Sequence, residues 1–510
     1  MVGSHAPQVH CPQTQMQSQE LKPVPENSTH ARDSNSKMRP RFSWANGPLL
    51  SLVLLLPCFW QSRIQSIDLS SHIYNAWLAS LISRNQAPGL WIAHQSNNVL
   101  FDFMLAWLLP RFGAAAAQRI AVAAAVLMFS WGAILLISRH RTRNWWFLLP
   151  SVAALSYGFV FHIGFFNFYL GLGICFWYLA LFFSGRWQTR LLITPLLALA
   201  WLAHPLPVVW AAGLAIYTAV AERLLPQPRV VLMTAGMVAL LGVHFFLAAR
   251  YRCFWSLDQA WYVTGANQLL LFDRKYAIPY ALLLAAWVML FWRLVKARRW
   301  RAVMGDLAFQ RWLLAAAAVV MIPSIITFPQ YALPLSFVAS RLSLAAAVLL
   351  CAWLVEAQLK RHEKMILAAG AVIFFGFVFR DGQELNRIED QLDAVVAQLP
   401  RNSRVISLLR APSKSRPPLL HAVDRACIGQ CFSYASYEPS SRQFRVRAAE
   451  GNPIVLADYN DVASVETGEY VVQAGDLPAY LVYSCGPEQQ QVCSRELHEG
   501  EMIGNLVPAG

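Results

Sequence analysis

Repeated apolar runs, each about as long as a bilayer is thick, dominate residues 45–380. A helix rises about 1.5 Å per residue, so about 20 residues cross a hydrocarbon core of about 30 Å. Runs near that length predict about eleven transmembrane helices. Only 14% of the residues are charged, against about 25% in soluble domains, so most of the chain has little water to face. We therefore predict an α-helical polytopic membrane protein.

Clusters of Lys and Arg between the apolar runs set the predicted orientation. Residues 139–143 and 293–301 carry such clusters, and one orientation puts nearly all of them on the same side. Cytoplasmic loops are enriched in Lys and Arg, so we expect that side to be cytoplasmic, together with a disordered tail of residues 1–44. The loop of residues 62–116 and the C-terminal residues 381–510 are then extracytoplasmic, in what we expect to be a bacterial inner (plasma) membrane.

The basic clusters that set the orientation also account for the formal net charge of +14. The basic residues lie in short clusters beside membrane segments, and no basic patch stands apart from them. We therefore expect the bilayer as a partner, and not nucleic acid.

The C-terminal residues 381–510 differ from the apolar region in pattern. Short alternating segments, often interrupted by Pro and Gly, predict a small β-rich or α+β domain. Its even set of cysteines favours disulfides, with free thiols, or a metal site at Cys427 and Cys431, as alternatives. The disulfide candidates are Cys427, Cys431, Cys485 and Cys493, and four cysteines allow three pairings.

The polar residues that follow the first apolar run carry the most distinctive chemistry. Asp68 and His72 are four residues apart, so on a helix they share one face. A carboxylate just outside the membrane could take a proton from a hydroxyl nucleophile. His72 could orient that nucleophile, or could join Asp68 in binding a divalent cation. The competing interpretation makes Asp68 an N-cap or first-turn acid of a surface helix and His72 an interfacial residue.

Further polar and basic residues are predicted to line a cavity above the helices. The same outer loop contains polar residues among aromatic ones, which is typical of a roofed cavity. Arginine suits a phosphate because its fork matches the phosphate oxygens, and several basic residues lie on the predicted outer side. For Arg341 the alternative is a snorkelling side chain. The predicted substrate-binding residues are Arg84, His94, Asn97, Asn98, Arg250, Arg252, Arg274, Lys275 and Arg341.

The features that follow the first apolar run come in a distinctive order. A first helix is followed by an outer loop that opens with Asp68 and His72, and then by Pro88-Gly89-Leu90. An apolar interfacial segment, Leu100–Pro110, precedes Phe112-Gly113 and a helix that begins near residue 118. This order resembles the membrane glycosyltransferases of the GT-C fold. The likeness covers residues 45–380 in architecture, and its specific part is residues 67–120.

The resemblance implies both a reaction and a catalytic residue. Such enzymes use polyprenyl-phosphate sugars, and an acidic residue of their first outer loop is the proposed base, which corresponds to Asp68. Many relatives have a second acid there, whereas this chain has His72. The implied function is inverting transfer of a sugar to an unidentified acceptor hydroxyl, without a nucleotide. A transporter or flippase, or a non-enzymatic envelope assembly protein, are the alternatives; polar residues at outer helix ends favour chemistry at the surface over passage through the membrane.

Overall fold

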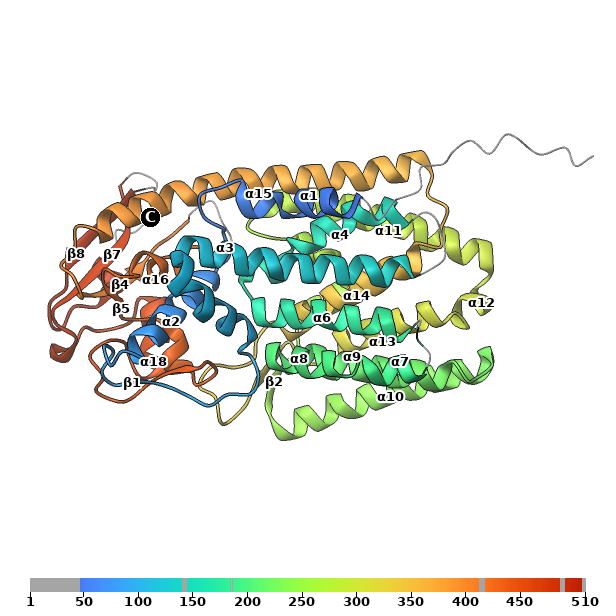
Figure 1. Cartoon of the computed structure of the whole chain (residues 1–510), viewed down its shortest axis with the longest axis horizontal. Coiled ribbons are helices and arrows are strands. Elements are labelled where there is room, and N and C mark those ends of the chain that lie inside the picture. The colour runs from blue at the N-terminus through green and yellow to red at the C-terminus, as the bar shows by residue number, and fades with distance from the viewer. Residues whose placement is uncertain are drawn as a thin grey trace, which may run out of the picture. The chain divides into compact units, whose positions relative to one another are not determined.

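Apolar helices packed side by side form the larger part of the structure (Figure 1). The computed structural model describes residues 46–139, 145–183, 185, 187–411, 418–486 and 491–506. The predicted disordered tail, residues 1–44, lies outside the described residues. The helices of this bundle are α1 (Gly47–Phe59), α3 (Leu100–Ser138), α4 (Leu149–Ser156), α5 (Phe159–Ile163), α6 (Phe166–Phe182), α7 (Trp187–Leu192), α8 (Pro195–Ala203), α9 (Pro205–Ala221), α10 (Pro226–Arg250), α11 (Ala277–Arg298), α12 (Trp300–Met304), α13 (Leu307–Met321), α14 (Val338–Leu354) and α15 (Arg361–Val396).

The lengths of these helices are those of a membrane protein, but they do not confirm about eleven spans. Among the described residues, five helical segments are long and apolar enough to cross a bilayer, and five further apolar helices have 10–17 residues. Hydropathy marks an apolar run without fixing where its backbone leaves the helix. The apolar run of residues 312–327, which we expected to be one of the spans, shows this: α13 ends at Met321, and Ile325–Thr327 forms a strand, β3.

The segment expected to lie at the interface, Leu100–Pro110, continues into the next span within the long helix α3. The helix bends at Gly113, whose φ of 75° and ψ of 168° are not helical. Glycine suits this bend because residues with a Cβ rarely adopt a positive φ. A Cβ built there would meet no heavy atom of the described chain within 4 Å, so the backbone conformation, and not crowding, calls for glycine.

Helix α15 runs through residue 380, where the sequence suggested that the membrane part ends. Residues 381–396 continue the same helix rather than starting a separate element. Arg63, which follows α1, pairs with this extension: its guanidinium lies 2.6 Å from Asp390 and 2.5 Å from Asp393. One helix thus belongs both to the bundle and to the region beyond it.

Residues 62–99 and 399–506 together form a second region, which we call the cap (Figure 1). Its main sheet has the strand order β5-β4-β7-β8, in which β4 runs parallel to β5 and β7, and β8 runs antiparallel to β7. Helices alternate with these strands, so of the two expectations for the C-terminal region the α+β one describes it. The cap elements are α2 (Leu69–Ile82), β1 (Leu90–Ile92), β4 (Arg404–Leu408), α16 (Ala422–Ala426), β5 (Phe432–Ser433), α17 (Tyr437–Ser441), β6 (Val446–Ala448), α18 (Tyr459–Thr467), β7 (Ala479–Cys485) and β8 (Gln491–Glu496).

The cap joins the loop that follows α1 to the C-terminal region. Strand β1, from the loop after α1, pairs antiparallel with β6, with Trp91 opposite Arg447. The loop before α14 also reaches the cap, because the backbone amide of Ala332 donates to the carbonyl of Ser441. Residues more than 300 positions apart in the sequence therefore meet at one end of the bundle.

The four candidate cysteines form two pairs within disulfide distance. Cys427 pairs with Cys431 and Cys485 with Cys493, at Cα–Cα distances of 4.6 and 6.0 Å. The first pair follows α16 and the second joins β7 to β8. The prediction of disulfides is confirmed in that both pairs lie within disulfide distance. The pairing of Cys427 with Cys431 argues against the alternative of a metal site at these two residues.

Candidate functional site

A polar cavity of about 490 Å³ lies where the cap meets the bundle. Its walls come from the start of α2, the turn between α5 and α6, the junction of α8 and α9, the start of α14, the residues just before α16, and the cap helices α17 and α18. Its polar and charged lining residues include Asp68, His72, Asn98, His204, Arg341, His421, Tyr437 and Glu466.

Asp68 occupies the N-cap position of α2, as the structural interpretation of the sequence expected. Within the described residues, however, its carboxylate makes no capping hydrogen bond, and the side chain lines the cavity instead. The backbone holds it in place, since the Asp68 amide donates to the carbonyl of Ile163 at 2.9 Å. Gly164 packs against this backbone so closely that a Cβ would lie 2.7 Å from the Asp68 nitrogen. The carboxylate is thus fixed in position but not used in capping.

The surroundings of Asp68 make it a suitable base near neutral pH. Burial raises the pKa of Asp68 to about 7, against the opposing effect of the positive charges of His72 and Arg341. On the cap side, Nε2 of His421 lies 3.8 Å from Oδ1 of Asp68. A carboxylate with a pKa near the working pH is both ionised and basic enough to accept a proton from a hydroxyl.

His72 has a different environment from the one predicted. Its Nδ1 faces two carboxylates, Glu438 at 3.2 Å and Asp102 at 3.3 Å. Burial opposes the charged imidazole, but these carboxylates outweigh it and raise the pKa of His72 well above its ordinary value. Burial also raises the pKa of Glu438, to about 7. The geometry favours a charged His72, which supports the ionised form of Asp68 through space.

Residues of the cap complete this part of the cavity. His421 stacks on Tyr437 with ring centroids 4.6 Å apart, and it presents Nε2 to Asp68. Both come from segments that begin more than 350 residues after Asp68, and so does Glu438. No local sequence pattern places them beside Asp68, because only the fold brings the C-terminal region over the first loop.

On the bundle side, Arg341 and His204 face each other. Arg341 is in the first turn of α14 and its guanidinium carbon lies 3.7 Å from the centre of the Phe165 ring. Its Nη1 is 3.4 Å from Nε2 of His204. Both residues are 8% exposed. Arg341 is one of the predicted substrate-binding residues, whereas His204 is not.

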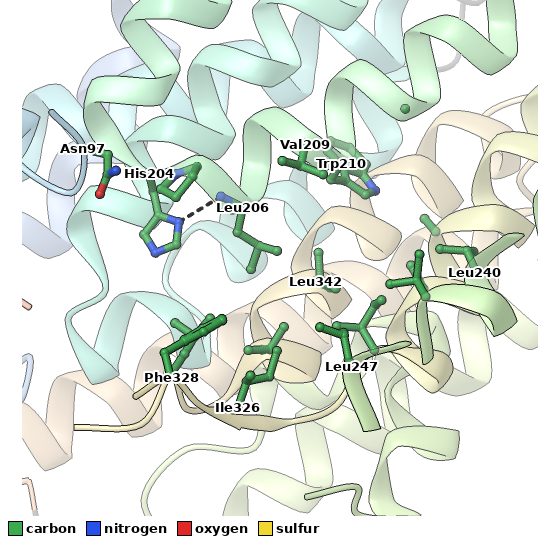
Figure 2. A pocket seen from close by; sticks show the side chains of 18 of the residues that line it. Asn97, His204, Leu206, Val209, Trp210, Leu240, Leu247, Ile326, Phe328 and Leu342 are labelled. Carbon is green, nitrogen blue, oxygen red and sulfur yellow. Dashed lines mark hydrogen bonds between the residues drawn. The ribbon is translucent and has the colours of Figure 1, made fainter. Parts of the chain in front are cut away.

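A second cavity, of about 870 Å³, adjoins the polar one and is lined mainly by apolar side chains (Figure 2). Helices α9, α10, α13 and α14 supply most of the wall, with residues such as Trp210, Leu240 and Leu342. We call it the apolar cavity. Lining residues that the two cavities share are Asn98, His204, Leu335 and Gln443.

The structure brings together some of the predicted site residues and separates others. Asp68, His72, Asn98 and Arg341 line the polar cavity, and Asn97 lines the apolar one. Lys275 instead lies 2.5 Å from Asp381 of α15 and 3.0 Å from Asp273, in an ion-pair group between α15 and the segment just before α11. The predicted residues that are exposed and outside the described lining of both cavities are Arg84, His94, Arg250, Arg252 and Arg274.

The cavity residues do not fit the predicted divalent cation well. Among the residues that the structure describes, no group of three or more His, Cys, Asp or Glu is placed to hold a metal. Metal ligation also requires a neutral imidazole, whereas the two carboxylates at its Nδ1 favour a charged His72.

Comparisons with protein-family models, with curated proteins and with solved structures gave no match. The site must therefore be interpreted from its own chemistry.

Proposed function

We propose that the chain is a membrane glycosyltransferase of GT-C type, which moves a sugar from a polyprenyl-phosphate donor to an acceptor hydroxyl. The observation that carries the proposal is the junction of the two cavities. A long apolar tail suits the apolar cavity, and a charged sugar-phosphate head suits the polar one. Since the cavities share lining residues, one amphipathic molecule can occupy both.

The residues of the polar cavity support the chemistry of an inverting transfer. Asp68 removes the proton of the acceptor hydroxyl as its oxygen attacks the anomeric carbon. The bond from that carbon to the phosphate oxygen breaks, and the polyprenyl phosphate leaves with the electron pair. Arg341 stabilises the negative charge that develops on the leaving phosphate. The products are the glycosylated acceptor and the lipid phosphate, so no nucleotide is consumed.

The basic clusters support an extracytoplasmic site. The cluster at residues 293–301 includes the end of α11 and the first two residues of α12, which lie at the end of the bundle away from the cap (Figure 1). Cytoplasmic loops are enriched in such residues, so the cap and its cavity are expected on the opposite side. The acceptor would then be a component of the cell envelope.

The test is sugar transfer by the full-length protein in lipid nanodiscs. Polyprenyl-phosphate donors with a series of labelled hexoses and pentoses are supplied with a membrane-envelope extract as acceptor. We expect release of polyprenyl phosphate and label in the acceptor fraction with one of the donors.

The matched variants are Asp68→Asn and Asp258→Asn. Asp258 is an exposed carboxylate outside the lining of both cavities in the described chain. Loss of a general base lowers transfer by about 10²–10⁴-fold, so Asp68→Asn should be nearly inactive and Asp258→Asn unaffected. Full activity in a folded Asp68→Asn protein would remove the base. A donor that binds with its sugar bond intact under all conditions would favour the transporter or assembly alternatives.

A further inference from the structure

His204 lies at the point where the two cavities meet and has contacts on both ring nitrogens. It is the N-cap residue of α9, and its Nδ1 accepts a hydrogen bond from the Leu206 amide at 3.1 Å. Figure 2 shows this bond, with the ring directed into the apolar cavity. On the other side, Nε2 lies 3.4 Å from Nη1 of Arg341.

These two contacts cannot both be hydrogen bonds. The Leu206 amide and the Arg341 guanidinium are both donors, and a neutral imidazole accepts at only one nitrogen. The bond from Leu206 is the shorter, and it satisfies an otherwise unpaired amide at the start of α9. Nδ1 is therefore the acceptor and Nε2 carries the proton. Two N–H groups, one on His204 and one on Arg341, then face each other.

Arg341 has further capacity for an acceptor. Its Nε is buried and has no hydrogen-bond partner among the described residues. Its guanidinium lies over the ring of Phe165, which offers no lone pair. Buried donors of this kind cost free energy unless an acceptor satisfies them. An oxyanion between His204 and Arg341 would accept from both.

We infer that His204 is a phosphate ligand: its Nε2–H and the Arg341 guanidinium together bind the phosphate of a lipid monophosphate. The inference deepens the proposed function and rests on it for the nature of the ligand. Because His204 lines both cavities, a phosphate bound there has its lipid tail in the apolar cavity and its other substituent beside Asp68. Arg341 is the only Lys or Arg in the described lining of either cavity, and one formal cation matches a single phosphodiester better than a diphosphate.

The test uses two substitutions that separate the roles of the ring nitrogens. In His204→Asn, the side-chain oxygen can replace Nδ1 as the cap of α9, since Asn is a favoured N-cap, but the donor at Nε2 is lost. In His204→Gln, the longer side chain can present an N–H near the position of Nε2, but the cap is lost. Binding of farnesyl phosphate, farnesyl diphosphate and farnesol to the full-length protein in nanodiscs is measured for both variants and the wild type.

For the wild type, we expect farnesyl phosphate to bind more tightly than farnesol and at least as tightly as the diphosphate. His204→Asn should weaken farnesyl phosphate binding by about tenfold or more and leave farnesol binding unchanged. His204→Gln should retain most of the affinity for the phosphate.

Opposite behaviour would overturn the inference. If His204→Gln loses affinity for all three ligands while His204→Asn binds like the wild type, His204 only caps α9. A diphosphate that binds much more tightly than the monophosphate would contradict the single-phosphate site. These results concern binding alone, so they stand apart from a failure of sugar transfer, which would count against the proposed function.

Discussion

The apolar cavity and the polar cavity adjoin, yet in the described chain only the polar one has Asp, Glu or Arg side chains in its lining. Helices α9, α10 and α13 line the first with side chains such as Trp210, Leu240 and Leu314. The second presents Asp68, Arg341 and the cap residue His421. The boundary between them is narrow and includes His204, which lines both.

The difference points to an amphipathic ligand. A small polar substrate would leave the larger, apolar cavity without a role, and a simple hydrocarbon would not need an arginine and a carboxylate in the lining of the adjoining cavity. The helices that line the apolar cavity differ in exposure. Most of α10 is exposed in the described chain, as expected of a helix that faces lipid, whereas α14 is almost fully buried. A lipid can therefore approach the apolar cavity from the side of α10.

Replacing Arg341, the arginine of the polar cavity, should have the largest effect on the rate of sugar transfer. In Arg341→Met, the developing charge on the leaving phosphate loses its main partner, and transfer should fall by about 10²–10³-fold. The measurement is initial rate with the polyprenyl-phosphate donor. Arg252→Met is the control, because Arg252 is exposed on the short strand β2 (Arg252–Phe254), outside the described lining of both cavities. Equal loss in both variants would mean that the phosphate binds elsewhere.

The pH dependence of transfer should depend on the polar cavity alone. Burial raises the pKa of Asp68 to about 7, so below that pH the base is increasingly protonated. The rate should fall about tenfold per pH unit below 7 and level off above it. Farnesol binding, which depends on the apolar cavity, should not change between pH 6 and 8. A rate that is independent of pH across this range would argue against Asp68 as the base.

Filling the apolar cavity should weaken lipid binding without changing the polar residues. Gly213 on α9 lines this cavity, and a Cβ there would meet no heavy atom of the described chain within 4 Å. The side chain of Gly213→Leu can therefore occupy space meant for the tail, and affinity for farnesyl phosphate should fall about tenfold. Gly242→Leu on α10 is the matched control, since it has equally open surroundings but is not among the described lining residues. Unchanged affinity in Gly213→Leu would place the tail outside this cavity.

The smallest expected effect concerns stability. The pKa of Asp68 rises on folding from an ordinary 3.8 to about 7 because of burial, so the protonated acid favours the fold. That stabilisation is complete below 3.8 and is lost as the pH rises through 7. Asp68→Asn removes the buried charge, so its melting temperature should exceed that of the wild type by a few degrees at pH 8, with a smaller gap at pH 5. A gap that is reversed or independent of pH would mean that the carboxylate is not destabilising.

Local sequence signals predicted the parts of the site that depend on short-range structure. Asp68 was found because it follows an apolar run and lies four residues before His72, and the bend at Gly113 falls where two apolar segments meet. The basic outer loops gave a weaker signal. Arg341 reaches the cavity, whereas Arg250 and Arg252 are exposed, because sequence position does not show which side of a loop faces inward.

The parts that depend on distant contacts could not be predicted. His421 and Glu438 reach Asp68 and His72 only because the C-terminal region folds over the first loop. The boundary between the bundle and the cap could not be predicted at α15, because the apolar first half of this helix continues into its polar second half without a turn. His204 was not among the predicted site residues, because the Nδ1 contact that caps α9 and the Nε2 contact with Arg341 are visible only in the folded chain.

A cryo-electron microscopy structure of the full chain with a bound polyprenyl-phosphate hexose would test the account most directly. We expect the prenyl tail among α9, α10 and α13, the phosphate between His204 and Arg341, and the anomeric carbon facing Asp68. A lipid whose head group lies outside the polar cavity, or whose tail lies away from the apolar one, would contradict the account.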